Sequence, residues 1–296
     1  MEHRTPWEGA GKGPDPFPPQ HQDRLPGLEY IMEPRPQAEG SRPCRRLEGK
    51  VALITGGDSG IGRAVAYDFV KAGAAVALVY YDEAVDAVET AERIKALGGR
   101  CLLLRGDLKD PSFAKACVER TVACFGKLDT LVNNHGVQII RRSILEIPPD
   151  QLTFLFQNNF FSFVYLIQAA LPHLGRGSSI INTASVTAYQ GHKDLIDYSA
   201  TKGAIVALTR SLALSLAEAG IRVNGVAPGP IWTPLIPSSF SAEEVRTFGV
   251  KTSRVPMLRA GQPREVSPCY VFLASEEASY MTGQILHPNG GTIVGG

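Results

Sequence analysis

Short apolar runs alternate with longer amphipathic segments from Gly49 to the end of the chain. An apolar run of about four to eight residues between turn residues predicts a buried strand, whereas apolar positions that recur with a helical period predict a helix. The predicted strands cover residues 51–55, 75–80, 101–105, 128–132, 178–183, 222–226 and 284–287. The predicted helices cover residues 61–71, 84–97, 112–125, 150–174, 197–219 and 264–274.

The order of these elements predicts the fold class. Strands that are apolar throughout and separated by helices indicate a parallel sheet that is covered on both faces. We therefore expect an α/β protein with a single doubly wound, Rossmann-type domain, whose central parallel sheet has about seven strands flanked by helices. The sequence shows no internal repeat and no second domain, so this domain is expected to span residues 48–296. Its ligands should bind at the carboxyl ends of the strands.

Residues 1–47 have a different composition. Nine of the 21 prolines lie there, at positions 6, 14, 16, 18, 19, 26, 34, 36 and 43. Such a segment cannot bury enough apolar surface to fold alone, so it is interpreted as an extended N-terminal arm. Phe17, Leu25, Leu28, Tyr30 and Ile31 could pin the arm to the body or to a neighbouring subunit; a floppy tail is the alternative.

Composition and charge narrow the choice of partners and compartment. The net charge of +1 gives no bulk electrostatic reason to bind nucleic acid or an anionic membrane. The five cysteines form no C-x-x-C pair, so we expect neither a disulfide framework nor a metal site. No apolar segment follows Met1 as in a signal peptide, and the apolar stretch 152–171 holds too many polar residues for a lipid-facing span. A soluble cytoplasmic protein is the expectation.

A glycine-rich turn follows the first predicted strand. Thr55–Gly62 has the pattern T-G-x-x-x-G-x-G, with glycines at positions 56, 60 and 62. Glycine allows the tight turn and lets the backbone approach a pyrophosphate, which the N-terminus of the following helix attracts. The position between a strand and a helix supports a dinucleotide site over a merely structural turn. The G-x-x-x-x-G-K-[ST] loop of nucleotide triphosphatases is absent.

The end of the second predicted strand should contact the adenosine ribose. A carboxylate there favours NAD, and a basic residue favours the 2′-phosphate of NADP. The sequence places Tyr80, Tyr81 and Asp82 at this point, and Ser59 in the glycine turn is not basic, so neither rule applies cleanly. NAD or NADP therefore both remain open, with a weak expectation that both are accepted. Asp107, followed by Leu108, could accept from the adenine amino group or cap the next helix.

Tyr198 and Lys202 are four residues apart on a predicted helix, which places them on one face. A phenol has a pKa of about 10, and lowering that pKa by about 3 units requires about 4 kcal/mol of preferential stabilisation of the phenolate. We expect the Lys202 ammonium to supply part of it, and an oxidised nicotinamide to supply more. Alternatively, the two residues are an ordinary surface pair.

Other polar residues should lie near this pair. Ser185 lies just past the carboxyl end of a strand, where its hydroxyl could donate to a substrate oxygen. The sequence 133–136, Asn-Asn-His-Gly, follows the fourth strand. Asn159 lies within the long apolar helix, where a buried amide must find hydrogen-bond partners.

In these motifs the sequence resembles the short-chain dehydrogenase/reductase family. The matching features, in order, are Thr55–Gly62, Asn133–Gly136, Asn159, Ser185, Tyr198 with Lys202, and Pro228-Gly229 after the sixth strand. They cover residues 49–296. The proline-rich arm, the glycine-turn variant and the sequence of residues 231–237 resemble a bacterial branch described as glucose-dehydrogenase-like or stress-related.

The resemblance implies a role for each of these residues. Tyr198 is implied as general acid in reduction and base in oxidation, Lys202 as the group that lowers its pKa and holds the nicotinamide ribose, Ser185 as the residue that orients the carbonyl, and Asn159 as the anchor of a water in a proton relay. The implied cofactor-binding residues are Gly56, Asp58, Ser59, Gly60, Ile61, Gly62, Tyr80, Tyr81, Asp82, Asp107, Leu108, Asn133, His135, Gly136, Thr183, Tyr198, Lys202, Pro228, Gly229, Ile231 and Thr233.

His135 departs from the family pattern, which usually has a small residue there. Its imidazole could crowd the cofactor, or point away and form local hydrogen bonds; a tolerated side chain beside the pocket is the simpler interpretation. His192 is treated as a loop residue outside the site. The stretch 231–256 is predicted to form a substrate lid with an apolar ceiling made of Trp232, Leu235, Ile236, Phe240 and Phe248.

The expected activity is reversible hydride transfer between nicotinamide and a carbonyl or alcohol carbon, with a small-molecule substrate that is partly apolar. Two alternatives are a nicotinamide-binding regulatory protein with little turnover, and an epimerase or dehydratase that keeps its cofactor. The excess of apolar residues on the helices 150–174 and 197–219 suggests a homo-oligomer, and the family is usually dimeric or tetrameric.

Overall fold

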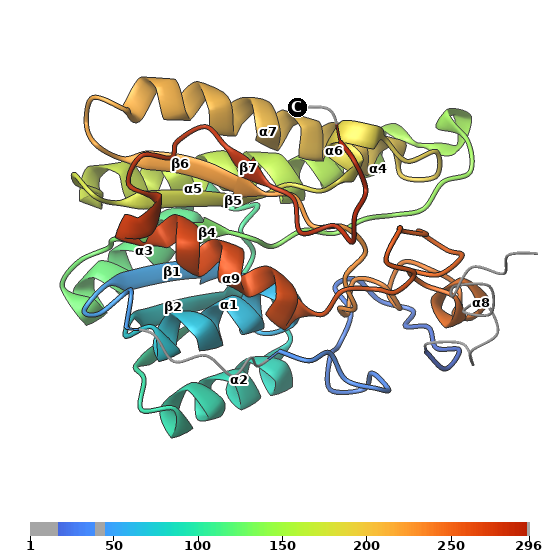
Figure 1. Cartoon of the computed structure of the whole chain (residues 1–296), viewed down its shortest axis with the longest axis horizontal. Helices are drawn as coiled ribbons and strands as arrows, with labels where there is room; N and C mark the ends of the chain where they lie inside the picture. The colour runs from blue at the N-terminus through green and yellow to red at the C-terminus, as the bar shows by residue number, and fades with distance from the viewer. Residues whose placement is uncertain (1–16, 39–44, 295–296) are drawn as a thin grey trace, which may run out of the picture.

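The computed structural model describes residues 17–38 and 45–294, and its central feature is one parallel β-sheet (Figure 1). Seven strands pair in the order β3-β2-β1-β4-β5-β6-β7. They are β1 Val51–Thr55, β2 Ala75–Tyr80, β3 Cys101–Arg105, β4 Thr130–Asn133, β5 Ser179–Thr183, β6 Arg222–Val226 and β7 Ile285–Leu286. The chain adds β2 and β3 on one side of β1 and then continues with β4 on the other side. Sheets of this kind bind ligands in the crevice at this change of side, between β1 and β4.

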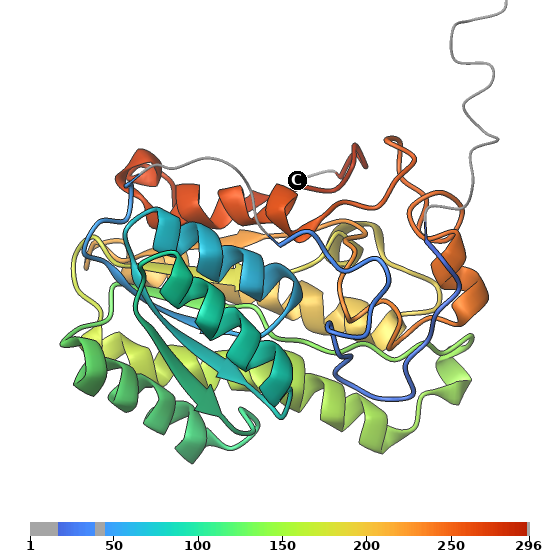
Figure 2. The same ribbon diagram turned by 90° about the horizontal axis from the view of Figure 1, so that it is seen from below.

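Helices cover both faces of the sheet. One face packs against α1 Gly60–Lys71, α2 Ala84–Ala96 and α9 Pro263–Ala274, and the other against α3 Pro111–Phe125, α5 Ser162–Ala170 and α7 Ile196–Leu216. Figure 2 shows α1 and α9 on one side of the sheet and α3 and α5 on the other. This doubly wound α/β arrangement confirms the predicted fold class.

The predicted strands and long helices are present with small shifts at their ends, because β1, β4 and β5 are buried along their whole length. Three differences stand out. The last strand is only two residues long, and the short helices α6 Thr187–Gln190 and α8 Ala242–Arg246 were not predicted. The helix predicted over residues 150–174 consists of α4 Pro149–Phe156, a π-turn over Gln157–Phe161, α5 and a 3₁₀ turn over Leu171–His173.

Within the described residues, the stretch Pro149–His173 is long and apolar enough to cross a membrane by length and composition. Its second half lies in the protein core instead. Phe163, Leu166 and Ala170 are fully buried, and α5 packs against α3. Core helices of globular proteins meet the same length and composition criteria, so the stretch is interpreted as a core helix.

The described part of the arm, residues 17–38, runs across the body without helix or strand (Figure 1). The expected anchor Phe17 is buried and stacks on Trp232 with 3.9 Å between ring centroids. Tyr30 and Ile31, two other expected anchors, are exposed, and Met32 is buried instead. The first sixteen residues and Cys44 lie outside the described residues.

The predicted lid differs from expectation at one position. Trp232 is fully buried, and its Nε1–H donates to the carbonyl oxygen of Pro34 at 2.7 Å. It packs beneath the arm with Phe17 and Met32 and borders neither of the two cavities described below. The prediction that Trp232 belongs to the substrate ceiling is therefore wrong, because the arm provides its packing partners.

Candidate active site

The glycine turn joins β1 to α1 in a conformation that requires glycine. Gly56 and Gly60 have φ angles of +59° and +51°, in the left-handed region. A Cβ on Gly62 would lie 1.9 Å from the carbonyl oxygen of Gly56, so this position must also be glycine. Ser59 precedes the helix without capping it through its side chain. The turn therefore brings backbone of a helix N-terminus to the carboxyl edge of the sheet, which suits a pyrophosphate, although the Gly60 N–H is already bonded to the Glu29 carboxylate.

Two adjoining cavities lie along the carboxyl edge of the sheet. The first, here called the glycine-loop cavity, is bordered by the predicted residues Gly56, Asp58, Ser59, Gly60, Ile61, Tyr80, Tyr81, Asp107, Leu108, His135, Gly136 and Thr233. The second, here called the Tyr198 cavity, is bordered by the predicted residues Ile61, Gly136, Thr183, Ser185, Tyr198, Lys202, Pro228, Gly229, Ile231 and Thr233. Ile61, Asn134, Gly136, Thr233 and Leu235 border both, so the two cavities form one continuous site.

The predicted residues Gly62, Asp82, Asn133 and Asn159 do not border either cavity. Asn133 is fully buried and donates through Nδ2 to Asn182 Oδ1 at 2.9 Å, so it joins β4 to β5 inside the sheet. Its assignment as a cofactor contact is corrected. The neighbouring Asn134 borders both cavities and donates through Nδ2 to the carbonyl oxygen of Thr55 at 3.1 Å.

The region after β2 is organised by ion pairs. Asp82 Oδ1 lies 2.6 Å from Arg24 Nη2 of the arm and does not face the cavity, contrary to expectation. Glu83 borders the cavity and is buried, and its Oε1 has no hydrogen-bond partner among the described residues. Asp107 pairs with Lys109 at 2.7 Å. The alternative that Asp107 caps the next helix is wrong, because Asp110 is the residue that caps α3.

His135 is held by two local hydrogen bonds. Its Nδ1 lies 2.7 Å from Thr55 Oγ1, and its Nε2 lies 2.8 Å from Ser162 Oγ. Burial, together with the nearby Lys202 charge, lowers the pKa of His135 to about 3, so the imidazole is neutral at pH 7. Of the two expectations for this residue, local hydrogen bonding describes the structure, and the ring fastens the glycine turn to α5.

Tyr198 and Lys202 project from one face of α7 into the same cavity, as their spacing predicts. Lys202 Nζ lies 5.6 Å from the centroid of the Tyr198 ring and donates to the carbonyl oxygen of Thr183 at 2.8 Å. Ser185 follows β5 and borders the same cavity. Two chain segments, the end of β5 and α7, thus bring a hydroxyl, a phenol and an amine to one place.

Burial governs the protonation of this group. It raises the pKa of Tyr198 to about 12, although a hydrogen bond with Ser185 opposes the rise. It lowers the pKa of Lys202 to about 7. We expected Lys202 to lower the pKa of Tyr198, but the pKa is raised. Burial of the phenolate outweighs any effect of the distant amine. In this state of the protein the phenol holds its proton firmly at pH 7.

Asn159 acts on the backbone of the loop after β4. It lies in the π-turn and is fully buried. Its Oδ1 accepts from Val137 N at 2.9 Å, and its Nδ2 donates to Val137 O at 2.8 Å. A Cβ added to Gly136 would lie 3.5 Å from both Asn159 Oδ1 and Lys202 Nζ, so the amide and the amine flank this glycine.

The rest of the Tyr198 cavity has an apolar roof and a polar rim. Four lid residues predicted for the ceiling, Leu235, Ile236, Phe240 and Phe248, border it. Polar side chains at its border include Gln138, Gln190, His192 and Arg254. His192, which the sequence argument left outside the site, therefore belongs to its lining.

Sequence reasoning missed the contribution of the arm. Leu25, Pro26 and Gly27 border the glycine-loop cavity beside Glu83 and Lys109. A Cβ on Gly27 would lie 2.3 Å from the carbonyl oxygen of Pro234, so the arm fits tightly against the lid. No periodic pattern signals such a contact. The one available hint was a glycine between Pro26 and Leu28 in a segment otherwise rich in proline.

Comparisons with known proteins agree with this arrangement. A family model described as enoyl-(acyl carrier protein) reductase matches residues 56–292. Glucose and ribitol dehydrogenase of Daucus carota is 50% identical over 288 residues, covering 95% of this chain and 98% of that protein. The chloroplastic NADPH-dependent aldehyde reductase 1 of Arabidopsis thaliana is 52% identical over 284 residues, covering 93% and 98%. A short chain dehydrogenase from Burkholderia cenocepacia J2315, solved in complex with NADP, superposes with a TM-score of 0.77 at 33% identity, covering 83% and 98%.

Proposed function

Because the chain belongs to the short-chain dehydrogenase/reductase family and is an NAD(P)-dependent oxidoreductase, we propose that it interconverts a carbonyl and an alcohol with Tyr198 as its general acid and base. One observation carries the proposal. Ser185, Tyr198 and Lys202 border a cavity that continues into the glycine-loop cavity. A substrate carbon and a dinucleotide could therefore be held side by side.

The residues of the glycine-loop cavity fit a dinucleotide. The helix N-terminus at Ser59, Gly60 and Ile61 borders this cavity and suits the pyrophosphate, and the close packing of Gly62 against Gly56 leaves no room for a side chain in the turn. Lys202 and Thr183 would hold the nicotinamide ribose, with Ile231 and Thr233 beside the nicotinamide. When bound, the cofactor supplies or accepts the hydride.

The side chains of the Tyr198 cavity would manage the proton. In the reduction direction the Ser185 hydroxyl orients the substrate oxygen, and Tyr198 donates its proton to that oxygen as negative charge develops. A phenol with a pKa of about 12 is protonated at pH 7, as this direction requires. Lys202, with a pKa of about 7, can return a proton toward the phenol. Asn159 would position the loop after β4 through its two hydrogen bonds with the backbone of Val137.

For the substrate, we propose a partly apolar aldehyde or ketone in preference to a free sugar. The roof formed by Leu235, Ile236, Phe240 and Phe248 offers apolar surface and few hydrogen-bond partners for ring hydroxyls. The relatives' names span both classes, a sugar and sugar-alcohol dehydrogenase and an aldehyde reductase. Equal kcat/KM on free glucose and on medium-sized aldehydes would contradict this preference.

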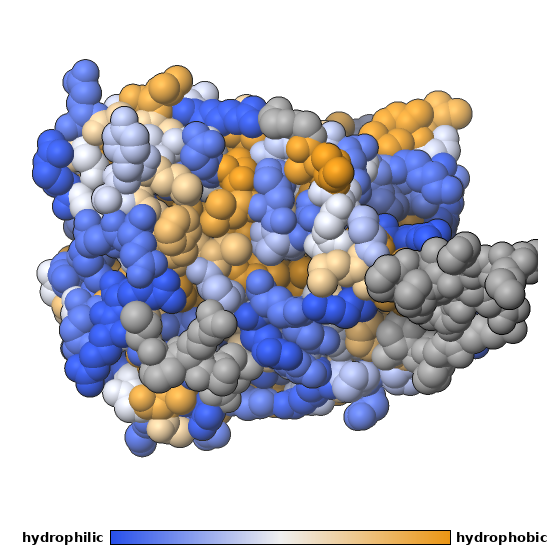
Figure 3. Space-filling model, in the orientation of Figure 1, coloured by the Kyte–Doolittle hydropathy of each residue, from blue (hydrophilic) through white to orange (hydrophobic). Residues whose placement is uncertain are grey.

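We also propose a cytoplasmic homo-oligomer, either a dimer or a tetramer. Leu214 on α7 is 83% exposed, Leu152 on α4 is 43% exposed and Phe161 in the π-turn is 40% exposed, so the outer faces of these helices offer apolar surface to a second copy. Figure 3 shows further apolar surface in the middle of the face where the edge strand β7 lies. The four described cysteines are free, as in a reducing compartment. Sedimentation showing only monomers at micromolar concentration would refute the assembly.

The replacement Tyr198→Phe tests the catalytic proposal. Loss of the proton donor should lower kcat for carbonyl reduction by about 10²- to 10⁴-fold, with the Kd for the reduced cofactor nearly unchanged. Tyr189→Phe is the matched control, because the Tyr189 hydroxyl makes no hydrogen bond among the described residues. If Tyr198→Phe retained wild-type turnover, the role of the phenol would be refuted. If the wild type bound cofactor but turned over no carbonyl in a panel, the regulatory alternative would replace the proposal.

A further inference from the structure

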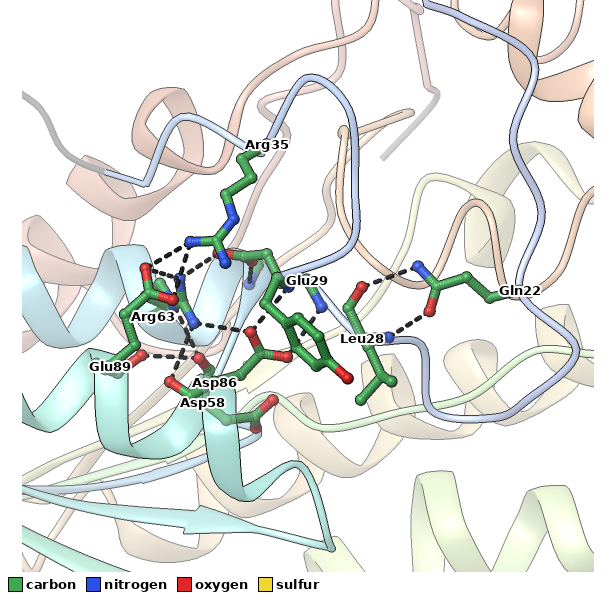
Figure 4. Close-up of polar contacts among 11 residues, drawn as sticks. Gln22, Leu28, Glu29, Arg35, Asp58, Arg63, Asp86 and Glu89 are labelled. Carbon is green, nitrogen blue, oxygen red and sulfur yellow. Dashed lines mark hydrogen bonds and ion pairs between the residues drawn. The ribbon is translucent and has the colours of Figure 1, made fainter.

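The arm carries a closed loop beside the glycine-loop cavity. Both polar atoms of the Gln22 side chain bond to the backbone of Leu28: Nε2 donates to its carbonyl oxygen at 2.8 Å, and Oε1 accepts from its N–H at 2.5 Å (Figure 4). Residues 22–28 are therefore fixed as a loop although they contain no helix or strand. Arg24 lies within this loop.

Ionic contacts fasten the same segment to the body just after the loop. Glu29 is buried, lies 2.6 Å from Arg63 Nη1 of α1, and accepts a hydrogen bond from Gly60 N at 2.5 Å. Asp86 of α2 accepts from the backbone N–H groups of Glu29 and Tyr30 at 2.9 and 3.0 Å (Figure 4). The loop that carries Arg24 is thus held in a fixed position relative to the glycine turn.

This anchoring holds Arg24 next to the cavity, although Arg24 itself is not one of its bordering residues. The three residues that follow it, Leu25, Pro26 and Gly27, border the cavity. Its Nη2 lies 2.6 Å from Asp82 Oδ1 and 3.7 Å from Oε1 of Glu83, which also borders the cavity. The contacts found for Arg24 among residues 17–38 and 45–294 use Nη2 alone, so Nε and Nη1 are left for another acceptor.

We propose that Arg24 recognises the 2′-phosphate of the adenosine ribose, so that the N-terminal arm, and not the end of β2, makes this enzyme prefer NADP(H) to NAD(H). The inference rests on the proposed cofactor site. β2 ends in Tyr80 and is followed by Tyr81, so the strand itself supplies neither the carboxylate that selects NAD nor a basic residue. The first carboxylate after them, Asp82, is already paired with Arg24.

Arginine suits this task better than the other nearby cation. Its planar guanidinium binds phosphate through two parallel N–H groups, whereas lysine acts as a point charge. Lys109 also borders the cavity, but its one amine is already bonded to Asp107 Oδ2 at 2.7 Å, whereas the guanidinium of Arg24 bonds to Asp82 through Nη2 and keeps further N–H groups. Arg24 is one-third exposed, so it can turn toward a phosphate without unfolding the arm.

The experiment isolates the adenosine end by calorimetry with 2′,5′-ADP and 5′-AMP as probes. Wild type should bind 2′,5′-ADP more tightly than 5′-AMP, and Arg24→Gln should weaken 2′,5′-ADP binding by about 10- to 100-fold while 5′-AMP binding changes less than about threefold. Arg35→Gln is the matched control, because Arg35 lies on the same arm and forms a similar exposed ion pair, but its partner Glu89 does not border the cavity, whereas Glu83 beside Arg24 does. It should leave both affinities unchanged.

Asp82→Asn separates recognition of the phosphate from simple attachment of the arm. If Arg24 only fastens the arm through Asp82, this variant should lose affinity for both probes as Arg24→Gln does, and the inference falls. If Arg24 binds the phosphate, Asp82→Asn should keep or strengthen 2′,5′-ADP binding. Unchanged discrimination between the probes in Arg24→Gln also overturns the inference. Failure of wild type to bind either probe would instead refute the proposed cofactor site.

Discussion

The sheet and the N-terminal arm meet at the same cavity but are held in place by different forces. The strands β1, β4 and β5 are buried along their whole length and fixed by parallel pairing, so their position depends on many apolar contacts at once. The arm has no regular structure between residues 17 and 38 and is held by a few contacts, chiefly Glu29 with Arg63 and Phe17 with Trp232. The sheet therefore tolerates small changes, whereas single replacements should release the arm.

A replacement in the glycine turn should have the largest effect and would test whether the body alone builds the cofactor site. Gly62→Ala adds a Cβ that would lie 1.9 Å from the carbonyl oxygen of Gly56, so the turn must shift. We expect NADPH affinity, measured by fluorescence titration, to fall by more than about 100-fold, equivalent to about 3 kcal/mol. Gly175→Ala is the control, because nothing lies within 4 Å of its added Cβ. Wild-type affinity in Gly62→Ala would show that the turn does not contact the cofactor.

The next effect concerns the ionic anchor of the arm. Glu29→Ala removes a buried partner of Arg63 and leaves the Gly60 N–H without its acceptor. Asp86 and Glu89 still face Arg63, so we expect a loss of about 2–4 kcal/mol in the free energy of unfolding, less than for a fully isolated charge. Urea denaturation measures it. Glu33→Ala, at an exposed position on the same arm, should cost less than about 0.5 kcal/mol; equal losses in both variants would contradict the anchor.

The same carboxyl makes the arm sensitive to pH, unlike the apolar core. Burial raises the pKa of Glu29 from 4.5 to about 7, against the opposing charge of Arg63. Between pH 4.5 and about pH 7 the folded state keeps a proton that the unfolded state has lost. The free energy of unfolding therefore falls as the pH rises to about 7 and levels off above it. The unfolding free energy of wild type minus that of Glu29→Gln should decrease by about 2 kcal/mol from pH 5 to pH 8. The subtraction removes the opposite trends of His135 and Lys202, whose pKa values are lowered.

A flat difference across this range would mean that Glu29 stays ionised beside Arg63. In that case Glu29 and Arg63 form an ion pair at every pH in this range. The arm would then differ from the apolar core in being held by charges, but not in its sensitivity to pH.

The smallest effect is expected at the other end of the arm. Phe17→Ala removes the ring that stacks on Trp232 at 3.9 Å and should cost about 1 kcal/mol, with cleavage in residues 17–38 appearing sooner under limited proteolysis. Phe17→Leu should restore most of the protection, because it retains apolar contact with the indole. Unchanged proteolysis in Phe17→Ala would show that the polar contacts suffice to hold the arm.

The sequence predicted what depends on local repetition. The apolar strands, the helical spacing of Tyr198 and Lys202, and the glycine turn each repeat or cluster within a few residues, and the structure places them as expected. These features follow from backbone geometry and burial, which act at short range along the chain.

What the sequence could not predict depends on contacts between distant segments. Asp82 was expected to face the ribose, but its partner Arg24 lies 58 residues away on the arm. Trp232 was expected over the substrate, but it packs against Phe17. Asn133 was expected at the cofactor, but its amide pairs with Asn182 inside the sheet. In each case the side chain's partner was set by the packing of the whole fold and not by its neighbours in sequence.

The π-turn over Gln157–Phe161 has a consequence for how this helix tolerates insertions and deletions. A π-turn contains one residue more than the α-turn it replaces. Deleting a single residue there would close the wide turn into a regular α-helix, in which each residue takes about 100° of the turn, so the side chains within the turn would face in new directions. The amide of Asn159 would then leave Val137, which borders the glycine-loop cavity, so the number of residues in this turn, and not merely the presence of the helix, shapes that cavity.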